Sequence, residues 1–415
     1  MSPLLIVAAL AAQTSTPAPA PASTESTGPK INPGTSTYVE IEAGAGYSSN
    51  PTLAIINDQG SAFGRIALHA VHSRVSARST TLVSAYAEDV SYTNHHGSQQ
   101  SLSLSGRHDA AVSEHVRLFA DVAATYSENG QLDTRLLGLP LVPPPIPGGT
   151  ITPPILIPPN GDFLSVTGRE YSFSGHAGGT FALGPHDSFS LTSGAEHVLF
   201  RSGAARTAYT TVPVSLAYDR QLSARTTVGA RVSAVDTEYD GPASVRSITP
   251  QLTARMTLSP QITFEGALGV SFARFDDGLT VRHSTGLSGD ARVCGQGETS
   301  FFCARVSADE QTATTAGPAR SLSAGVDYTQ RLDRDQSLSF SLSATRYSSP
   351  RSVIIGQTFS DTTYLRASAS YSRRFSTRLF GGVDVAARKL TQNGPDPKTD
   401  LSASLFIRYR LGDLQ

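Results

Sequence analysis

The sequence predicts an all-β chain that crosses a membrane as an antiparallel up-and-down β-barrel of about 16 strands. Three observations predict this class. Long segments alternate apolar and polar residues with a period of two, and a short turn motif recurs between them. Only 16% of the 415 residues are charged, against roughly 25% in typical soluble domains. We expect the transmembrane barrel to occupy residues 37–412.

Two segments of different composition precede the predicted barrel. Residues 4–12 form an apolar run of the length found in a secretory signal, although no Lys or Arg precedes it. Ala9 and Ala11 supply a small-x-small cleavage site. Pro, Ala, Ser and Thr dominate the following stretch, which cannot bury enough apolar surface to fold. We therefore expect a signal peptide at residues 1–12 and a disordered leader at residues 13–36.

A four-residue motif marks the expected tight turns: an apolar residue, a turn former, a variable residue, then usually Arg, His or Gln. Its copies begin at Val75, Val112, Leu183, Leu222, Leu258, Leu332 and Phe375. Ser, Asp and Gly favour turns because they bond to the nearby backbone or adopt unusual dihedral angles. The strands joined by these turns, together with single strands at residues 39–47 and 401–411, give the even count of about 16 expected for an outer-membrane barrel.

The alternating segments fit strands that span a bilayer. Residues 401–411 place Leu, Ile and Tyr on one face and mostly Ser and Arg on the other, over the roughly 9 to 11 residues that a tilted membrane strand needs. Such a sheet must close on itself because hydrocarbon leaves no partner for a free edge. Pro213 and Pro250 fall inside predicted strands, so we expect each to mark a bulge or a strand boundary.

Other classes are excluded. No window approaches the roughly 18 to 20 continuous apolar residues of a membrane helix. The net charge of -1 and the lack of a basic cluster exclude nucleic-acid binding. We find no nucleophile elbow, phosphate-binding loop or metal-ligand spacing, so we expect neither an enzyme nor a cofactor.

Two spacings between turn motifs are long, and each encloses an apparent insertion. The first is Pro-rich, at residues 143–159, and could fold inward as a constriction or plug, or form a contact surface. The second, residues 276–317, contains Cys294 and Cys303, the two cysteines of the chain. In an oxidising compartment we expect a disulfide between them that pins an external loop.

Charged residues on the polar faces of the strands are the candidate functional set. If the apolar faces meet lipid, these side chains line the lumen and could tune solute selectivity. A salt-bridged, hydrated interior without a selective role explains the same pattern. Arg outnumbers acidic residues in the set, which favours a weak anion preference. The candidates are Arg65, Arg117, Asp121, Arg231, Arg255, Glu265, Asp327, Arg366, Asp384, Arg408 and Arg410.

The turn motif, the strand layout and the terminal comb of Leu405, Ile407, Tyr409 and Leu411 resemble the outer-membrane β-barrel proteins of Gram-negative bacteria, in particular the β-barrel porin group. The resemblance covers about residues 38–412. It implies location in the bacterial outer membrane, contact with its lipid, and insertion by the barrel-assembly machinery. Chains of that group usually end on an aromatic residue, whereas here the comb closes at Leu411 and residues 412–415 follow.

Two functions compete at this point. The first is a porin-like channel for passive diffusion of small hydrophilic solutes. The second is a structural or interaction barrel of the envelope without transport, which the resemblance connects with polysaccharide export. An autotransporter is disfavoured because strands consume almost the whole chain, and about 20 residues of leader cannot form an exported domain.

Overall fold

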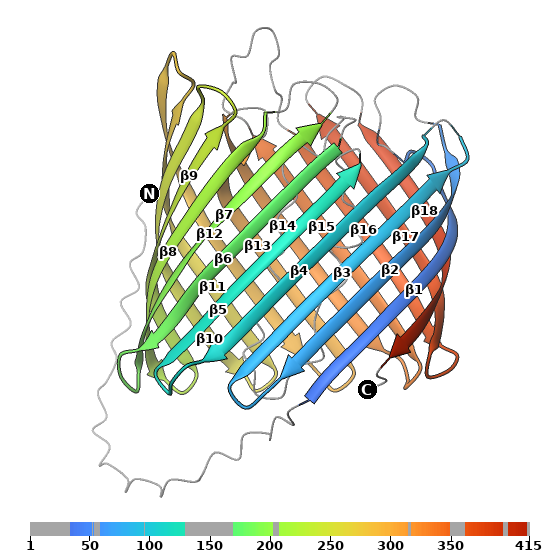
Figure 1. Ribbon diagram of the computed structural model, residues 1–415, viewed down its shortest axis with the longest axis horizontal. Coiled ribbons are helices and arrows are strands. Elements are labelled where there is room, and N and C mark those ends of the chain that lie inside the picture. Colours follow the sequence, from blue (N-terminus) through green and yellow to red (C-terminus); the bar gives the residue numbers. More distant parts are fainter. Residues whose placement is uncertain are drawn as a thin grey trace, which may run out of the picture.

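The computed structural model describes residues 34–51, 53, 59–94, 96–128, 169–201, 207–313, 317–348, 362–392 and 397–412. They form one 18-stranded antiparallel sheet, which closes into a barrel because β1 pairs with both β2 and β18 (Figure 1). The predicted antiparallel barrel is therefore confirmed. The strands are β1 (Gly34–Ser48), β2 (Ser61–Val75), β3 (Ser79–Tyr92), β4 (Ser98–Ala111), β5 (Val116–Glu128), β6 (Arg169–Ala182), β7 (Asp187–Arg201), β8 (Tyr209–Ser223), β9 (Thr226–Tyr239), β10 (Ser244–Ser259), β11 (Ile262–Asp276), β12 (Val281–Gln296), β13 (Ser300–Ala313), β14 (Gly317–Arg331), β15 (Gln336–Ser348), β16 (Thr362–Arg374), β17 (Leu379–Gln392) and β18 (Lys398–Gly412).

The strand count differs from the prediction by one hairpin. The segment expected to be an external loop at residues 276–317 instead forms β12 and β13. Its turn, residues 297–299, lacks the repeated motif, and β12 is rich in Gly and polar residues, with Leu287 and Val293 among few large apolar side chains. The alternation of apolar and polar residues is too weak there to indicate a strand. These residues form strands because they pair with the neighbouring strands of the sheet.

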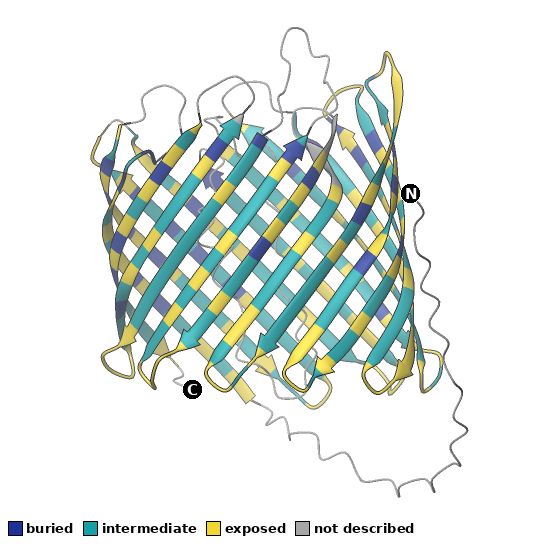
Figure 2. Cartoon of the chain, turned by 180° about the vertical axis from the view of Figure 1, so that it is seen from behind, coloured by how far each residue is buried: buried dark blue, intermediate teal, exposed yellow. Residues whose placement is uncertain are grey.

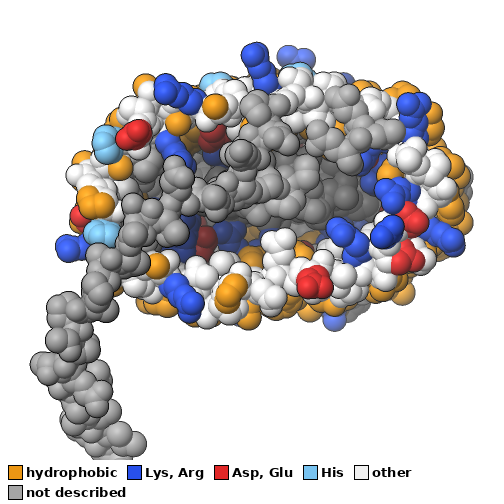
Figure 3. Space-filling view, turned by 90° about the horizontal axis from the view of Figure 1, so that it is seen from below, with side chains coloured by type: hydrophobic (Ala, Val, Ile, Leu, Met, Phe, Trp, Pro, Cys, Tyr) orange, Lys and Arg blue, Asp and Glu red, His pale blue; other side chains and the backbone are white. Residues whose placement is uncertain are grey.

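The outer and inner faces of the wall follow the predicted alternation. In β18, Leu405, Ile407 and Tyr409 are exposed on the outside, whereas Arg408 and Arg410 lie inside. Figure 2 shows the same alternation along other strands. Seen from the end with the tight turns, hydrophobic side chains form much of the outer rim, and charged side chains line the inner wall (Figure 3). The barrel therefore presents an apolar surface to its surroundings and a polar surface to its lumen.

The repeated motif forms the tight turns at one end of the barrel, which we call the turn end; the opposite end is the loop end. In most copies the second residue of the motif caps the turn with its side chain. Ser76 Oγ accepts the Ser79 N–H at 2.9 Å, Asp333 Oδ1 accepts the Asp335 N–H at 2.7 Å, and Ser376 Oγ accepts the Leu379 N–H at 3.1 Å. These bonds explain why Ser and Asp recur there.

Four tyrosines lie on the outside of the barrel near the turn end. Tyr218, Tyr328, Tyr371 and Tyr409 lie on the outer face close to the ends of β8, β14, β16 and β18. The hydroxyls of Tyr218 and Tyr371 donate to Asp187 at 2.5 Å and Gln336 at 2.7 Å. An apolar ring with a satisfied polar tip is typical of side chains at a membrane surface.

The two strand prolines do not produce bulges or boundaries. Pro213 and Pro250 pair without interruption with β9 on one side. On the other side, the β7–β8 and β10–β11 ladders each skip a short step and resume in the same register. The missing N–H of each proline therefore interrupts the pairing with one neighbouring strand only. The ladder is intact before and after each interruption.

Several of the expected segments fall wholly or partly outside the described residues. The signal peptide and nearly all of the leader fall in residues 1–33, which lie outside them, as does the Pro-rich insertion at 143–159. Because β1 begins at Gly34, residues 34–36 belong to the first strand rather than to the leader.

Candidate functional site: the charged inner wall

Strand alternation and pairing place every charged candidate from the sequence on the inner face of the wall. A network of ion pairs links several of them to carboxylates that the sequence analysis did not single out. The inner-face candidates are Arg65, Arg117, Asp121, Arg231, Arg255, Glu265, Asp327, Arg366, Asp384, Arg408 and Arg410.

The most enclosed part of the wall centres on Arg65 of β2. Its Nη1 lies 2.8 Å from Glu42 Oε1 of β1, and its Nε donates to Glu88 Oε2 of β3 at 2.7 Å. The Tyr86 hydroxyl donates to Glu88 and accepts from Arg65 Nη2 at 3.3 Å. The side chains of Arg65 and Glu88 are only 7% and 2% exposed, so the Arg65 guanidinium is held between two carboxylates inside the wall and compensates both.

The same network continues across the strands that close the barrel. Arg408 of β18 donates from Nη2 to Glu42 Oε2 at 2.7 Å, and Arg410 donates from Nη2 to Glu40 Oε1 at 2.5 Å. Because β1 and β18 are the first and last strands, these pairs bridge the point where the sheet meets itself. We call Glu88, Arg65, Glu42, Arg408, Glu40 and Arg410 the seam network.

A second network lies on β9–β12. Glu265 bridges Arg255, whose Nε lies 2.9 Å away, and Arg292, with which it forms a close ion pair. Arg231 donates from Nη2 to Gln251 Oε1 at 2.6 Å and to Asp290 Oδ1 at 3.2 Å. Arg255 and Asp290 are 59% and 52% exposed, more than any member of the seam network, so water screens their charges more strongly.

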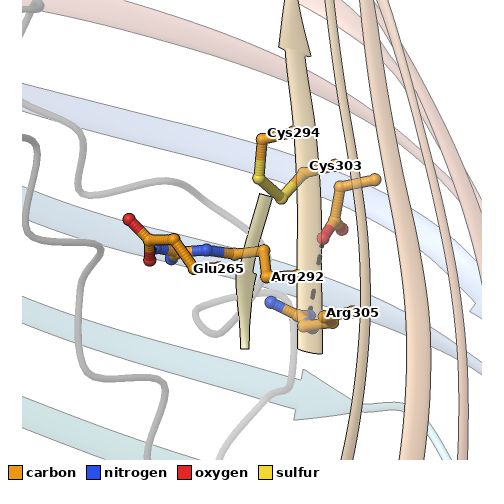
Figure 4. Close-up of a disulfide and its surroundings, with 6 residues drawn as sticks. Glu265, Arg292, Cys294, Cys303 and Arg305 are labelled. Carbon is orange, nitrogen blue, oxygen red and sulfur yellow. Dashed lines mark hydrogen bonds and ion pairs between the residues drawn. A yellow bond between two sulfur atoms is a disulfide. The ribbon is translucent and has the colours of Figure 1, made fainter. Parts of the chain in front are cut away.

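The cysteines sit on this part of the wall, not in an external loop. Cys294 of β12 and Cys303 of β13 are direct partners in the ladder, with Cα atoms 4.0 Å apart, and form a disulfide on the inner face toward the turn end. Figure 4 shows the disulfide beside Arg292 and Arg305. The expected external location is wrong because β12 and β13 were taken for a loop.

At the loop end, a buried carboxylate holds the first residues after β1 against the wall. Asp400 of β18 is fully buried. It accepts from Ser48 Oγ at 2.6 Å, from the Asn50 N–H at 2.8 Å and from Arg388 Nη2 at 2.7 Å. Arg388 Nη2 also donates to the Pro51 carbonyl at 3.1 Å. The start of the β1–β2 connection is therefore tied to β17 and β18.

The remaining candidates lie apart from these clusters. Asp121 of β5 lies 3.0 Å from His176 Nδ1 of β6, and Asp327 of β14 lies 3.5 Å from Arg305 Nη2. Arg117 is exposed near the turn end of β5. The strand pairing places the last two candidates: Arg366 of β16 is the ladder partner of Arg388, and Asp384 of β17 is the ladder partner of Ser370 and Ser404.

On the described part of the inner wall, carboxylates outside the candidate set offset most of its arginine excess. Glu40, Glu42, Glu88, Asp290 and Asp400 add carboxylates to it, and each contacts an arginine. The alternation of Glu40 and Glu42 with apolar neighbours in the first strand was a signal that could have identified them. Arg292 and Arg305 had no such signal, since they belong to the hairpin taken for a loop. Mutual compensation is therefore the main electrostatic feature of the wall.

Among the described residues, no group of three or more His, Cys, Asp or Glu side chains is arranged to hold a metal ion. The described part of the chain also contains no helix long and apolar enough to cross a membrane.

The closed antiparallel sheet, its apolar outer face and its charged inner wall together define a β-barrel of the bacterial outer membrane. No protein-family model matches the sequence, and no curated protein matches it.

Solved structures similar to the chain are barrels with little sequence identity to it. OccK2 (OpdF) of Pseudomonas aeruginosa is 9% identical, with 92% of this chain and 98% of that chain covered and a TM-score of 0.46. OpdQ of the same organism is 8% identical, with 91% and 99% covered and a TM-score of 0.41. The siderophore receptor PirA of Acinetobacter baumannii is 6% identical, with 91% and 80% covered and a TM-score of 0.44.

Proposed function

We propose that the barrel is a porin-like channel through which small hydrophilic solutes diffuse passively. The observation that carries the proposal is the compensated charge of its inner wall. In the seam network each arginine contacts a carboxylate at 2.5 to 2.8 Å, so charges are held to the wall and to one another. A solute that passes such a wall meets a polar, hydrated surface that does not retain it tightly.

The width of the barrel supports the same conclusion. The sheet has 18 strands, and barrels of about 16 to 18 strands are wide enough to leave an aqueous channel. Because the wall charges compensate one another, we infer a channel that sorts solutes by size more than by charge, with a weak ion preference.

A liposome-swelling assay tests the proposal. Folded protein is identified by a gel mobility that changes on boiling. It is reconstituted into vesicles, which are then diluted into isotonic arabinose or raffinose. We expect swelling that is fast in arabinose and slower in raffinose. Protein-free vesicles and vesicles with boiled protein are the controls. Swelling no faster than these controls, with folded protein in the membrane, would overturn the channel.

A further inference from the structure

The fourth residue of each tight-turn motif extends the strand ladder by one pair at the turn end. The Arg78 carbonyl accepts the Ala111 N–H at 2.7 Å, and the Arg225 carbonyl accepts the Thr257 N–H at 2.8 Å. The same bond occurs at every copy of the motif and in the turn at residues 297–299. Residues directly opposite each other in a ladder share one face of the sheet, and Ala111 and Thr257 belong to the inner face. Each turn therefore places its last residue on the inner face at the mouth of the barrel.

The last residues of the eight tight turns and the residues opposite them form the inner edge of the turn-end mouth, which we call the turn rim. Six of the rim residues are arginines and two are histidines, whereas Asp335 is its single carboxylate. The whole chain has 33 basic and 34 acidic residues, so its composition does not explain the excess of arginine at the rim. The rim consists of Arg78, His115, His186, Arg225, Gln261, Thr299, Asp335 and Arg378, opposite Ala111, Ala182, Gln221, Thr257, Gln296, Arg331, Arg374 and Arg410.

Two of the six rim arginines have a carboxylate partner. Arg374 Nη2 lies 2.7 Å from Asp335 Oδ1, and Arg410 Nη2 lies 2.5 Å from Glu40 Oε1. The other four are exposed, and among the described residues no carboxylate contacts them. They are Arg78 after β2, Arg225 after β8, Arg331 at the end of β14 and Arg378 after β16. These unpaired charges are therefore spread around the mouth, and Figure 3 shows basic side chains on all sides of this end.

Carboxylates in the turns do not cancel the charge of the rim. The tips of the tight turns, between the first and last residue of each turn, carry Glu114, Glu298 and Asp333 against a single arginine, Arg334. Three carboxylates less one arginine leave two negative charges at the tips, against the four unpaired arginines of the rim. The turn-end mouth therefore keeps a positive excess.

Unpaired charges around a mouth act together on a solute that enters it. A cleft lined by one sign of charge focuses the electric field and raises the local concentration of counter-ions. Rings of arginine or lysine make pores selective for anions. Farther from the turns, the charges of the seam network are held in ion pairs. The unpaired charge of the described inner surface is therefore greatest at the turn end.

We propose that the turn rim is an electrostatic funnel that draws small hydrophilic anions into the channel from the turn end. The inference rests on the proposed function, because it names the solutes that the channel admits most readily. The rim sets the sign of the weak ion preference, and this preference decreases as salt screens the rim arginines.

A salt gradient applied in both directions across one inserted channel tests the funnel. The solutions are about 0.01 M and about 0.1 M KCl, for which the Debye length is about 30 Å and about 10 Å, so the rim charges reach farthest when the dilute solution bathes them. We expect reversal potentials with the sign of anion selectivity in both directions. The ratio of anion to cation permeability should be several-fold larger in one direction than in the other. Equal ratios in the two directions would overturn the funnel.

Two double variants assign the difference between the directions to the rim. Arg78→Gln with Arg225→Gln removes two unpaired rim charges, and Gln261 shows that glutamine occurs at this position of the motif. The matched control is Arg74→Gln with Arg220→Gln, which removes two exposed arginines from the outer face of β2 and β8, beside the same turns. We expect the rim variant to reduce the difference by more than half and the control to preserve it. The same change in both double variants would contradict the assignment.

Charged thiol reagents measure the potential at the rim without requiring an open channel. Ala111→Cys places a single free thiol opposite Arg78, since the native cysteines are bonded to each other. The protein in nanodiscs reacts with a negatively or a positively charged methanethiosulfonate, and the ratio of the two rates is compared with that of a free thiol in solution. We expect the ratio to favour the anionic reagent several-fold. Adding Arg78→Gln should lower it toward the value in solution, whereas adding Arg74→Gln should leave it unchanged.

The two measurements separate the funnel from the channel. A barrel that conducts, while Ala111→Cys gives the same rate ratio with and without Arg78→Gln, loses the funnel and keeps the channel. Folded protein that does not conduct, yet favours the anionic reagent only while Arg78 is present, loses the channel and keeps a rim that attracts anions.

Discussion

Removal of Arg65 should destabilise the barrel more than removal of any exposed wall arginine. Its guanidinium lies within 2.8 Å of Glu42 and 2.7 Å of Glu88, and unit charges about 4 Å apart attract by about 4 kcal/mol at an effective dielectric constant of 20. Glu42 keeps its contact with Arg408 after Arg65→Met, but Glu88, 2% exposed, loses the guanidinium that lies 2.7 Å from it. We expect a loss of about 3 to 5 kcal/mol in the free energy of unfolding, the usual cost of breaking a buried ion pair by removing one partner.

A urea titration of protein in lipid vesicles measures this loss, with the folded fraction read from unboiled gel mobility. Adding Glu88→Gln to Arg65→Met should recover more than half of it, because the buried charge that Arg65 contacts is then removed as well. The matched control is Arg255→Met. Arg255 is 59% exposed and its partner Glu265 keeps Arg292, so its loss should cost less than about 1 kcal/mol. Equal destabilisation by the two single substitutions would refute the reasoning.

Three further predictions concern other parts of the wall. Asp400→Asn removes the charge that Arg388 contacts at 2.7 Å and should free the start of the β1–β2 connection, seen as faster proteolysis near residue 50; an unchanged cleavage pattern would argue against the anchor. Ser376→Ala removes the turn cap and should lower the free energy of unfolding by about 1 kcal/mol, measured by the same urea titration; no change would mean that the cap is dispensable. In a reconstituted bilayer, Arg255→Gln should shift the reversal potential toward cation selectivity and Glu265→Gln toward anion selectivity, and shifts of the same sign would contradict the assignment of these side chains to the channel wall.

The sequence predicted the barrel because two of its signals are local. The strand at residues 401–411 shows its outer and inner faces directly in its alternation, and the turn motif contains the very side chains that cap the turns, such as Ser76 and Ser376. Neither signal depends on contacts between distant residues. Strand number was less accessible, since β12 and β13 carry weak alternation and depend on β11 and β14 for their pairing.

The site was predictable as a set of positions but not as a set of contacts. Alternation assigns Arg65, Arg408 and Arg410 to the polar face, yet the carboxylates that meet them come from other strands, which neighbour them along the chain for Arg65 and only through closure for Arg408 and Arg410. Glu42 meets Arg408 because the first strand pairs with the last. Register between these strands fixes the seam network, and no pattern within a single strand specifies it.

Single-channel recording in a planar bilayer tests the central claim most directly. The protein is added after its gel mobility has been shown to change on boiling, as expected for a closed barrel. We expect stable conductance steps with a weak ion preference, because the inner wall is polar and its charges are compensated. Folded protein that inserts into the bilayer and produces no conductance step would contradict an open, water-filled lumen.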